Sequence, residues 1–283
     1  MYTSIANTTF SYLQTLNKFR NSIPEEHRPS WVKVTTITMV SKFLDEIDIQ
    51  ALRNYFSENT MKIKQVGSTF EGFEWKIKNT KFYNQITLTY VDKYSTKSIK
   101  VFPNGSVQVA GCSDLFDCNR IIKQLTFLLK KILNLQKEIP SDSFRVVMIN
   151  SNFSLNYNIN LFRLYNHFLE NKIFNVTFDP DRYSAVKIKF KPASDMKQVT
   201  VSIFGTGKII VTGAETLREI VFAYNVINHH ILSEIENIKV SKVSEVEKFE
   251  TFLGYNIEEL ITKTYELGFR PWDFLTSNDQ INF

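Results

Sequence analysis

The chain has 283 residues, of which 43% are hydrophobic and 22% are charged. This composition predicts a soluble globular protein with a core in one large or two modest domains. No apolar stretch approaches the length of a membrane-spanning helix, and residues 1–20 lack the apolar core of a signal peptide, so we expect an intracellular protein. A formal net charge of +5 permits nucleic-acid binding without requiring it.

The first predicted element is an arm over residues 1–30. Its apolar residues recur at helical spacing, and a polar, proline-bearing linker follows over residues 22–29. We expect this arm to dock loosely or to bind a partner.

Residues 31–138 then predict a strand at 32–40, a helix to residue 56, three strands ending at residue 111 and a long helix over 115–135. Residues 139–239 repeat this order, with a strand at 146–157, a helix at 160–170, strands over 174–213 and a long helix over 215–238. Residues 240–283 predict about two further helices as a helical C-terminal extension, and Gly268 is a plausible C-cap.

One sequence pattern underlies this repetition. Val-Phe-Pro-Asn-Gly-Ser-Val-Gln-Val-Ala-Gly at 101–111 returns as Ile-Phe-Gly-Thr-Gly-Lys-Ile-Ile-Val-Thr-Gly at 203–213. Each copy reads as strand, tight hairpin and strand, and the spacing is 102 residues both from Phe102 to Phe204 and from Gly105 to Gly207. Copies of about a hundred residues are too long for solenoid units, so the pattern predicts a pseudo-twofold domain. Antiparallel strands would cover one face of each long helix and leave the other sheet face free for function.

Enzymatic and metal-binding sites find little support. The four histidines are scattered, and no nucleophile elbow or His-Glu-x-x-His signature occurs. Cys112 and Cys118 have no neighbouring histidine and cannot form a zinc site, so we interpret them as reduced and structural, with a transient disulfide as the alternative. We expect no enzyme, no metal and no cofactor.

The tandem order of strand, helix, four strands and a long helix resembles the core of the TATA-box-binding protein (TBP) family. The second copy also carries the matching pattern Ile-Phe-x-x-Gly-Lys-x-x-x-Thr-Gly-Ala. The divergence and the flanking extensions look more like the TBP-like factors of large DNA viruses than the cellular protein. The resemblance implies an α+β saddle, in which a curved antiparallel sheet carries helices on its convex face. Its concave face would bind promoter DNA in the minor groove, in the nucleus or in the viral factory of an infected cell.

The family inserts two pairs of phenylalanines into base steps and kinks the duplex. The second member of each pair matches Phe102 and Phe204, which could otherwise be ordinary core residues. The first matches Tyr83 and Tyr183, although the register at Tyr83 could slip by one residue. A tyrosine ring can still act as a wedge, but its hydroxyl must stay hydrated or find an acceptor.

The resemblance also implies groove-facing residues on the first and last strand of each copy. The family's central asparagines align with Thr36 and Met148, and strand alternation gives Thr38, Asn150 and Asn152 the same face. Asn150 would read the groove floor in a shifted register, unless these are ordinary sheet-surface residues. On the last strands, the resemblance places Val109, Lys208, Val211 and Thr212 on DNA.

The family's flanking lysines survive only as Lys208, and Ser106, Ser113 and Glu215 take the other three places. Such losses should weaken DNA binding and flatten its salt dependence. Two functions therefore stay open: a general transcription initiation factor that bends promoter DNA, and a TBP-fold interaction module with weakened or lost DNA binding.

The family's Glu-Pro-Glu-Leu-Phe segment holds a IIB-type initiation factor, and here Asp179, Pro180 and Asp181 match its first three positions. The resemblance thus implies a IIB-like factor and RNA polymerase as partners. Asp-Pro-Asp is also a common turn opener, so a purely local role is the alternative.

Overall fold

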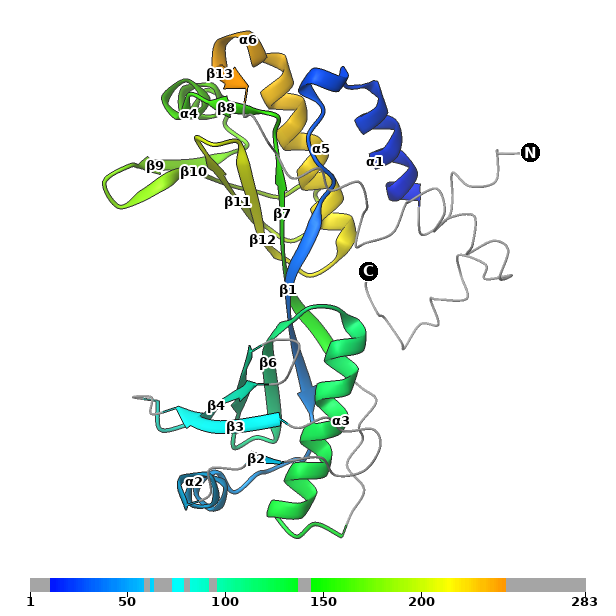
Figure 1. Ribbon diagram of the computed structural model, residues 1–283, viewed down its shortest axis with the longest axis vertical. Coiled ribbons are helices and arrows are strands. Elements are labelled where there is room, and N and C mark those ends of the chain that lie inside the picture. Colours follow the sequence, from blue (N-terminus) through cyan, green and yellow to red (C-terminus); the bar gives the residue numbers. More distant parts are fainter. Residues whose placement is uncertain are drawn as a thin grey trace, which may run out of the picture. The chain divides into compact units, whose positions relative to one another are not determined.

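The computed structural model describes residues 11–58, 62–63, 73–78, 82–91, 96–136 and 144–242 (Figure 1). These residues fall into two compact units. One unit is Thr36–Met148, called here the first unit; the second unit comprises the described residues before Thr36 and after Met148. Within the described residues, no helix has both the length and the apolar character needed to cross a membrane.

The first unit contains an antiparallel sheet with strand order β2-β3-β4-β5-β6-β1. Its strands are β1 (Lys33–Lys42, whose first three residues belong to the second unit), β2 (Lys62–Ile63), β3 (Phe73–Lys78), β4 (Ile86–Val91), β5 (Thr96–Val101) and β6 (Ser106–Cys112). Helix α2 (Ile49–Glu58) contacts β3 and β4, and the long helix α3 (Leu115–Ile132) contacts β6.

The second unit repeats this plan with strand order β7-β12-β11-β10-β9. Its strands are β7 (Arg145–Ser154, whose first four residues belong to the first unit), β9 (Asn175–Asp179), β10 (Tyr183–Phe190), β11 (Val199–Phe204) and β12 (Lys208–Ala214). Helix α4 (Leu161–Leu169) contacts β9 and β10, and α5 (Leu217–Ser233) contacts β11 and β12. Two short strands, β8 (Tyr157–Ile159) and β13 (Lys239–Lys242), pair separately, and α6 (Ile235–Ile238) lies between α5 and β13 in the sequence.

The repeated hairpins depend on glycines in a left-handed conformation. Gly105 and Gly207 have φ angles of 78° and 81°. A Cβ at Gly105 would lie 1.7 Å from the carbonyl oxygen of Leu44, and one at Gly207 would lie 2.4 Å from that of Tyr157. No other residue type fits either turn without backbone movement, because both the φ angle and the space favour glycine.

The N-terminal arm is packed more closely than the sequence suggested. Helix α1 (Ser11–Ser22) contacts α5, and Tyr12 and Leu16 are buried. The Arg20 guanidinium lies 4.4 Å from the centre of the Trp31 ring, and the Tyr224 hydroxyl of α5 donates to the carbonyl of Ser30. The expectation of loose docking is therefore wrong for residues 11–30, because apolar burial, a cation–π contact and hydrogen bonds fix them to the second unit. The predicted C-terminal helices lie outside the described residues.

The starts of the two long helices are held in different ways. In α5, Thr216 and Glu219 form a capping box, and Glu219 also accepts from the backbone N–H groups of Glu215 and Lys197. In α3, Asp114 caps the helix and Asp117 takes the place of Glu219. These caps satisfy N–H groups that have no partner inside a helix.

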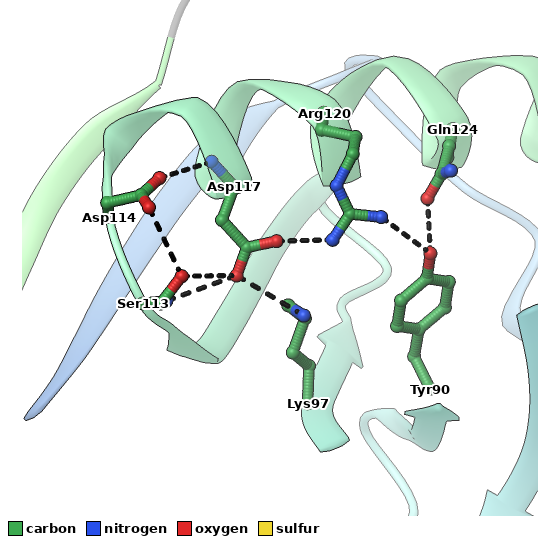
Figure 2. Close-up of polar contacts among 7 residues, drawn as sticks. All are labelled: Tyr90, Lys97, Ser113, Asp114, Asp117, Arg120 and Gln124. Carbon is green, nitrogen blue, oxygen red and sulfur yellow. Dashed lines mark hydrogen bonds and ion pairs between the residues drawn. The ribbon is translucent and has the colours of Figure 1, made fainter. Parts of the chain in front are cut away.

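Asp117 also forms a buried ionic network that α5 lacks at the matching positions (Figure 2). The Lys97 ammonium lies 3.2 Å from Asp117, and their side chains are 0% and 6% exposed. Arg120 contacts both Asp117 and the Tyr90 hydroxyl, which in turn contacts Gln124. In the second unit the cross-strand pair matching Tyr90 and Lys97 is the apolar pair Phe190 and Val199.

Candidate nucleic-acid interface

Each sheet has a face that is covered by its long helix. In the first unit, Val107 and Val109 of β6 pair with Val101 and Ile99 of β5, and all four side chains are 0% exposed. In the second unit, Ile209 and Val211 of β12 pair with Ile203 and Val201 of β11 and are equally buried. Because side chains alternate along a strand, the residues between these positions form the opposite face, called here the free face.

The free face of the first unit carries polar rows with lysines. One row crosses four strands through Thr87, Lys100, Gln108 and Val40, and Lys78 of β3 pairs with Thr87 at its end. A neighbouring row joins Lys42 to Ser106. Among the side chains that the structure describes on this face, Lys42 and Lys78 are exposed and Lys100 is half-buried, which gives three cations.

The free face of the second unit has the same construction. One row runs through Lys187, Ser202, Ile210 and Asn152, and Lys189, Thr200 and Thr212 form the next. Lys208 pairs with Ser154 at the hairpin end. Lys189 and Lys208 are exposed and Lys187 is half-buried, so this face also presents three cations.

The predicted wedge residues Phe102 and Phe204 lie at the hairpin end of each sheet, where Phe102 directly follows β5 and Phe204 is the last residue of β11. In the second unit the Tyr183 and Phe204 rings meet edge to face, with centroids 5.7 Å apart and planes at 64°. Phe204 pairs with Ala185, whose small side chain leaves room beside the rings. In the first unit Phe102 is half-buried, and Tyr83 is 88% exposed. The second unit therefore brings its two predicted wedge rings into contact, whereas Tyr83 of the first unit is open to solvent.

Two of the predicted DNA-contacting residues lie on the other face of the sheet, and a third lies on the free face but is buried. Val109 and Val211 lie on the helix-covered face and are 0% exposed, so their predicted position on DNA is wrong. The error is one of strand alternation: the neighbouring Gln108 and Ile210 occupy the free face. Thr38 pairs with Ala110 on the free-face row but is only 3% exposed, which leaves almost no side-chain surface for a ligand.

The other candidates on the first and last strands are partly exposed. Thr36 and Met148 are half-buried in the first unit, and Asn150 and Asn152 are half-buried on β7 of the second unit. Thr212 is half-buried and donates to the carbonyl oxygen of Thr200, 3.3 Å away.

Five free-face lysines were missed by motif comparison: Lys42, Lys78, Lys100, Lys187 and Lys189. None lies at a position that the TBP resemblance marks. A signal was nevertheless present in the sequence, because Lys100 stands two residues before Phe102 and so shares its face. Counting outward from the wedge in steps of two would have found this lysine.

The three positions that lost lysine have specific contacts. Glu215, which follows β12, forms an ion pair with Lys197. The Ser113 backbone N–H donates to Asp117 in the network of Figure 2. Ser106 donates its backbone N–H to the Asn104 side chain within the hairpin. These residues hold the strand ends together and present no cation.

The proposed partner segment forms the turn between β9 and β10. Asp179, Pro180 and Asp181 are all exposed. The Asp179 carboxylate lies 3.5 Å from Arg182 Nε, and these side chains are 55% and 88% exposed. An ion pair this open to water contributes little stability, so both carboxylates remain accessible.

The cysteines and histidines form no recognisable metal centre in the part of the chain that the structure describes. Cys112 and Cys118 are buried, and their mutual hydrogen bond together with burial raises the pKa of the Cys118 thiol. A high pKa suppresses the reactive thiolate, which fits the structural interpretation of this pair. His167 Nε2 and His230 Nδ1 lie 3.3 Å apart between α4 and α5, surrounded by phenylalanine rings.

Comparisons with known proteins agree with this architecture. The family model for transcription factor TFIID, or TATA-binding protein, matches residues 143–234. A TATA-box-binding protein-like protein of Acanthamoeba polyphaga mimivirus is 30% identical over 241 residues, which span 71% of this chain and 65% of the relative. The TATA-box-binding protein of Archaeoglobus fulgidus is 22% identical over 65% of this chain and 86% of that protein. The chain is a divergent TBP-like protein.

The fold of this TBP-like protein is also seen in a solved structure. Methanococcus jannaschii TBP matches with a TM-score of 0.51 and 16% identity, covering 72% of this chain and 99% of that one. At this identity the match concerns the fold alone. It confirms the predicted α+β class with antiparallel sheet and packed helices, and the matches together confirm the resemblance to viral TBP-like proteins.

Proposed function

We propose that this TBP-like protein is a DNA-binding transcription initiation factor that binds promoter DNA in the minor groove and bends it. The observation that supports this most directly is the division of each sheet into a helix-covered apolar face and a free face with three lysines and terminal aromatic rings. Side chains that wedge into base steps unstack them and kink the duplex, and cations beside them neutralise phosphates.

The proposal is tested by measuring the bend. Energy transfer between dyes at the two ends of an AT-rich duplex should rise when the protein binds, and should fall toward the unbent value in Phe102→Ala with Phe204→Ala. A matched control removes two exposed rings that lie on helices, Phe127→Ala and Phe162→Ala, which are 51% and 65% exposed. An unchanged bend in the first double variant would rule out the wedge assignment.

The salt dependence of binding distinguishes this function from the alternative. Six free-face lysines that each neutralise one phosphate would give a log–log slope of at most about −5, at about −0.9 per phosphate. A TBP-fold interaction module without DNA affinity is the second candidate, favoured by the carboxylate of Glu215 and the serines at former lysine positions. The absence of salt-sensitive binding to any duplex would favour that module.

The exposed turn at Asp179–Asp181 supports a second part of the proposal, recruitment of a IIB-like factor and, through it, RNA polymerase. Two accessible carboxylates on a proline-containing turn suit a basic patch and would contribute orientation and association rate. Asp179→Lys with Asp181→Lys should abolish the ternary complex with the cognate IIB-like factor while binary DNA binding persists. Asp195→Lys is the matched control, since Asp195 is also exposed and pairs with Arg218 at 3.0 Å elsewhere in the second unit. Ternary assembly that survives the double reversal would leave the turn with a structural role only.

A further inference from the structure

The aromatic pair of the second unit carries a lysine on its surface. The Lys187 ammonium lies 4.1 Å from the centre of the Tyr183 ring, and the same ring contacts Phe204 edge to face at 5.7 Å. A cation within about 6 Å of a ring centre is attracted by the ring quadrupole. Tyr183 is therefore held by two contacts, and it is 37% exposed.

The first unit has its lysine in a different place. By the spacing of the two copies, Thr87 matches Lys187 and Lys100 matches Ser202. The pairs Thr87–Lys100 and Lys187–Ser202 occupy the same place in the two sheets. Each pair contains one lysine, which lies on the second strand of the pair, β5, in the first unit and on the first strand, β10, in the second unit. Tyr83, which matches Tyr183, is 88% exposed, and Thr87 is 6% exposed.

From this asymmetry we propose that Lys187 is a positioning residue for the Tyr183 wedge, so that the second unit inserts its aromatic pair into DNA from a pre-set orientation. The inference rests on the proposed DNA-bending function. A ring already ordered in the free protein loses less conformational freedom on insertion, and this preorganisation improves binding. The Tyr83 wedge of the first unit would order only on insertion.

Lys187 also has a role once the ring has inserted. Phe204 enters the same base step, so one face of the Tyr183 ring would stack on a base pair while the ammonium stays over the other face. Its stem is rooted in β10, on the free-face row with Ser202 and Ile210, which keeps the charge beside the kinked step. Acceptors there are phosphate oxygens and the minor-groove atoms N3 of adenine and O2 of thymine. The lysine thus keeps its ring contact and gains a DNA acceptor on insertion, so its charge is satisfied in both states.

The test separates the two wedges by variant background. In Phe102→Ala the remaining bend depends on the Tyr183 and Phe204 pair, and Lys187→Met should there reduce the bent fraction about fivefold, as expected for a cation–π contact of ordinary strength. In Phe204→Ala the same substitution should change the bend less than twofold. Such a difference between backgrounds is the coupling that a double-mutant cycle measures.

Two further variants distinguish positioning from simple charge. Lys187→Arg keeps a cation over the ring and should retain the bend. Lys189→Met removes an exposed lysine two residues away on the same face, and should reduce the salt slope by about one without lowering the bent fraction of bound DNA. In the free protein, Lys187→Met should shift the ring proton resonances of Tyr183.

The outcomes separate this inference from the proposed function. If the unaltered protein neither binds nor bends duplex DNA, the proposed function fails, and the inference fails with it. If the unaltered protein bends DNA but Lys187→Met has equal effects in both backgrounds, or no effect in Phe102→Ala, only the inference is overturned. Loss of the bend in Lys189→Met to the same degree would also overturn it.

Discussion

The buried ion pair between Lys97 and Asp117 should make a large contribution to the stability of the first unit (Figure 2). Lys97→Met keeps most of the side-chain volume but leaves the Asp117 carboxylate, 6% exposed, without the ammonium that lies 3.2 Å away. Breaking a buried pair in this way costs about 3–5 kcal/mol. We expect about 3 kcal/mol, the lower end, because Arg120 still contacts the carboxylate.

Removing both charges should cost less than the sum of the single changes. Asp117→Asn alone leaves the Lys97 ammonium buried at 0% exposure, and we again expect a loss of about 3 kcal/mol. In the double variant neither site keeps a buried charge, and the asparagine oxygen can still accept from the Ser113 N–H. The Arg120 guanidinium loses its carboxylate, but it is 29% exposed and still donates to the Tyr90 hydroxyl. The expected loss is about 2–3 kcal/mol, which gives a coupling energy of about 3–4 kcal/mol between the two sites.

Hydrogen exchange read by mass spectrometry suits this test because it reports on each unit separately, whereas a single melting curve would mix them. Lys97→Met should speed exchange in peptides from β4, β5 and α3 by about a hundredfold, since 1.4 kcal/mol corresponds to a factor of ten. Peptides from β10, β11 and α5 serve as the internal control and should change little. Strict additivity, with the double variant losing about 6 kcal/mol, would refute the coupling.

Two further predictions concern the second unit. Burial and the neighbouring His167 lower the pKa of His230. Below the ordinary histidine pKa of about 6.5 the folded state therefore binds fewer protons than the unfolded state. The contribution of neutral His230 to the free energy of unfolding is present above that pH and is lost as pH falls through the lowered pKa. The fall in melting temperature between pH 7.5 and pH 5 should therefore shrink in His230→Gln, and an identical pH profile would contradict the assignment. Gly207→Ala should cost about 3 kcal/mol because its Cβ would lie 2.4 Å from a carbonyl oxygen at a φ of 81°, whereas at Gly205 the nearest atom would be 3.6 Å away. Equal stability of the two alanine variants in urea unfolding would show that the hairpin relaxes freely.

The sequence was sufficient to predict the repeated hairpin and the long helices. The hairpin glycines could be recognised because their φ angles exclude other residues, and Asp114 and Thr216 mark the helix starts through side-chain caps. These signals are local, so they survive without knowledge of the tertiary structure. The positions of Phe102 and Phe204 directly before the hairpins followed from the same local pattern.

Predictions that depended on distant contacts were less successful. Nothing near α1 in the sequence indicates that α5 receives it, because the contacts of Tyr224 with Ser30 and of Arg20 with Trp31 form only on folding. Val211 was given the wrong face because two adjacent β-branched residues, Ile210 and Val211, suit either side of a strand. Only the burial of Val211 beneath α5 decides which residue is free.

The lysine exchange between paired strands explains why motif comparison underestimates the first unit. Lys100 on β5 and Lys187 on β10 belong to matching cross-strand pairs of the two sheets. Each pair therefore contributes one positive charge to its own free face. Strand pairing fixes which face a position belongs to, but leaves open which of two paired residues is charged. Positions can therefore diverge while the charge of the face persists. The family model matches only residues 143–234, yet the described side chains of the first unit include three free-face lysines, as those of the second unit do. If both units bind DNA, Lys100→Met and Lys187→Met should each reduce the slope of log affinity against log salt concentration by about one. This equality should hold although the two substitutions affect the DNA bend differently.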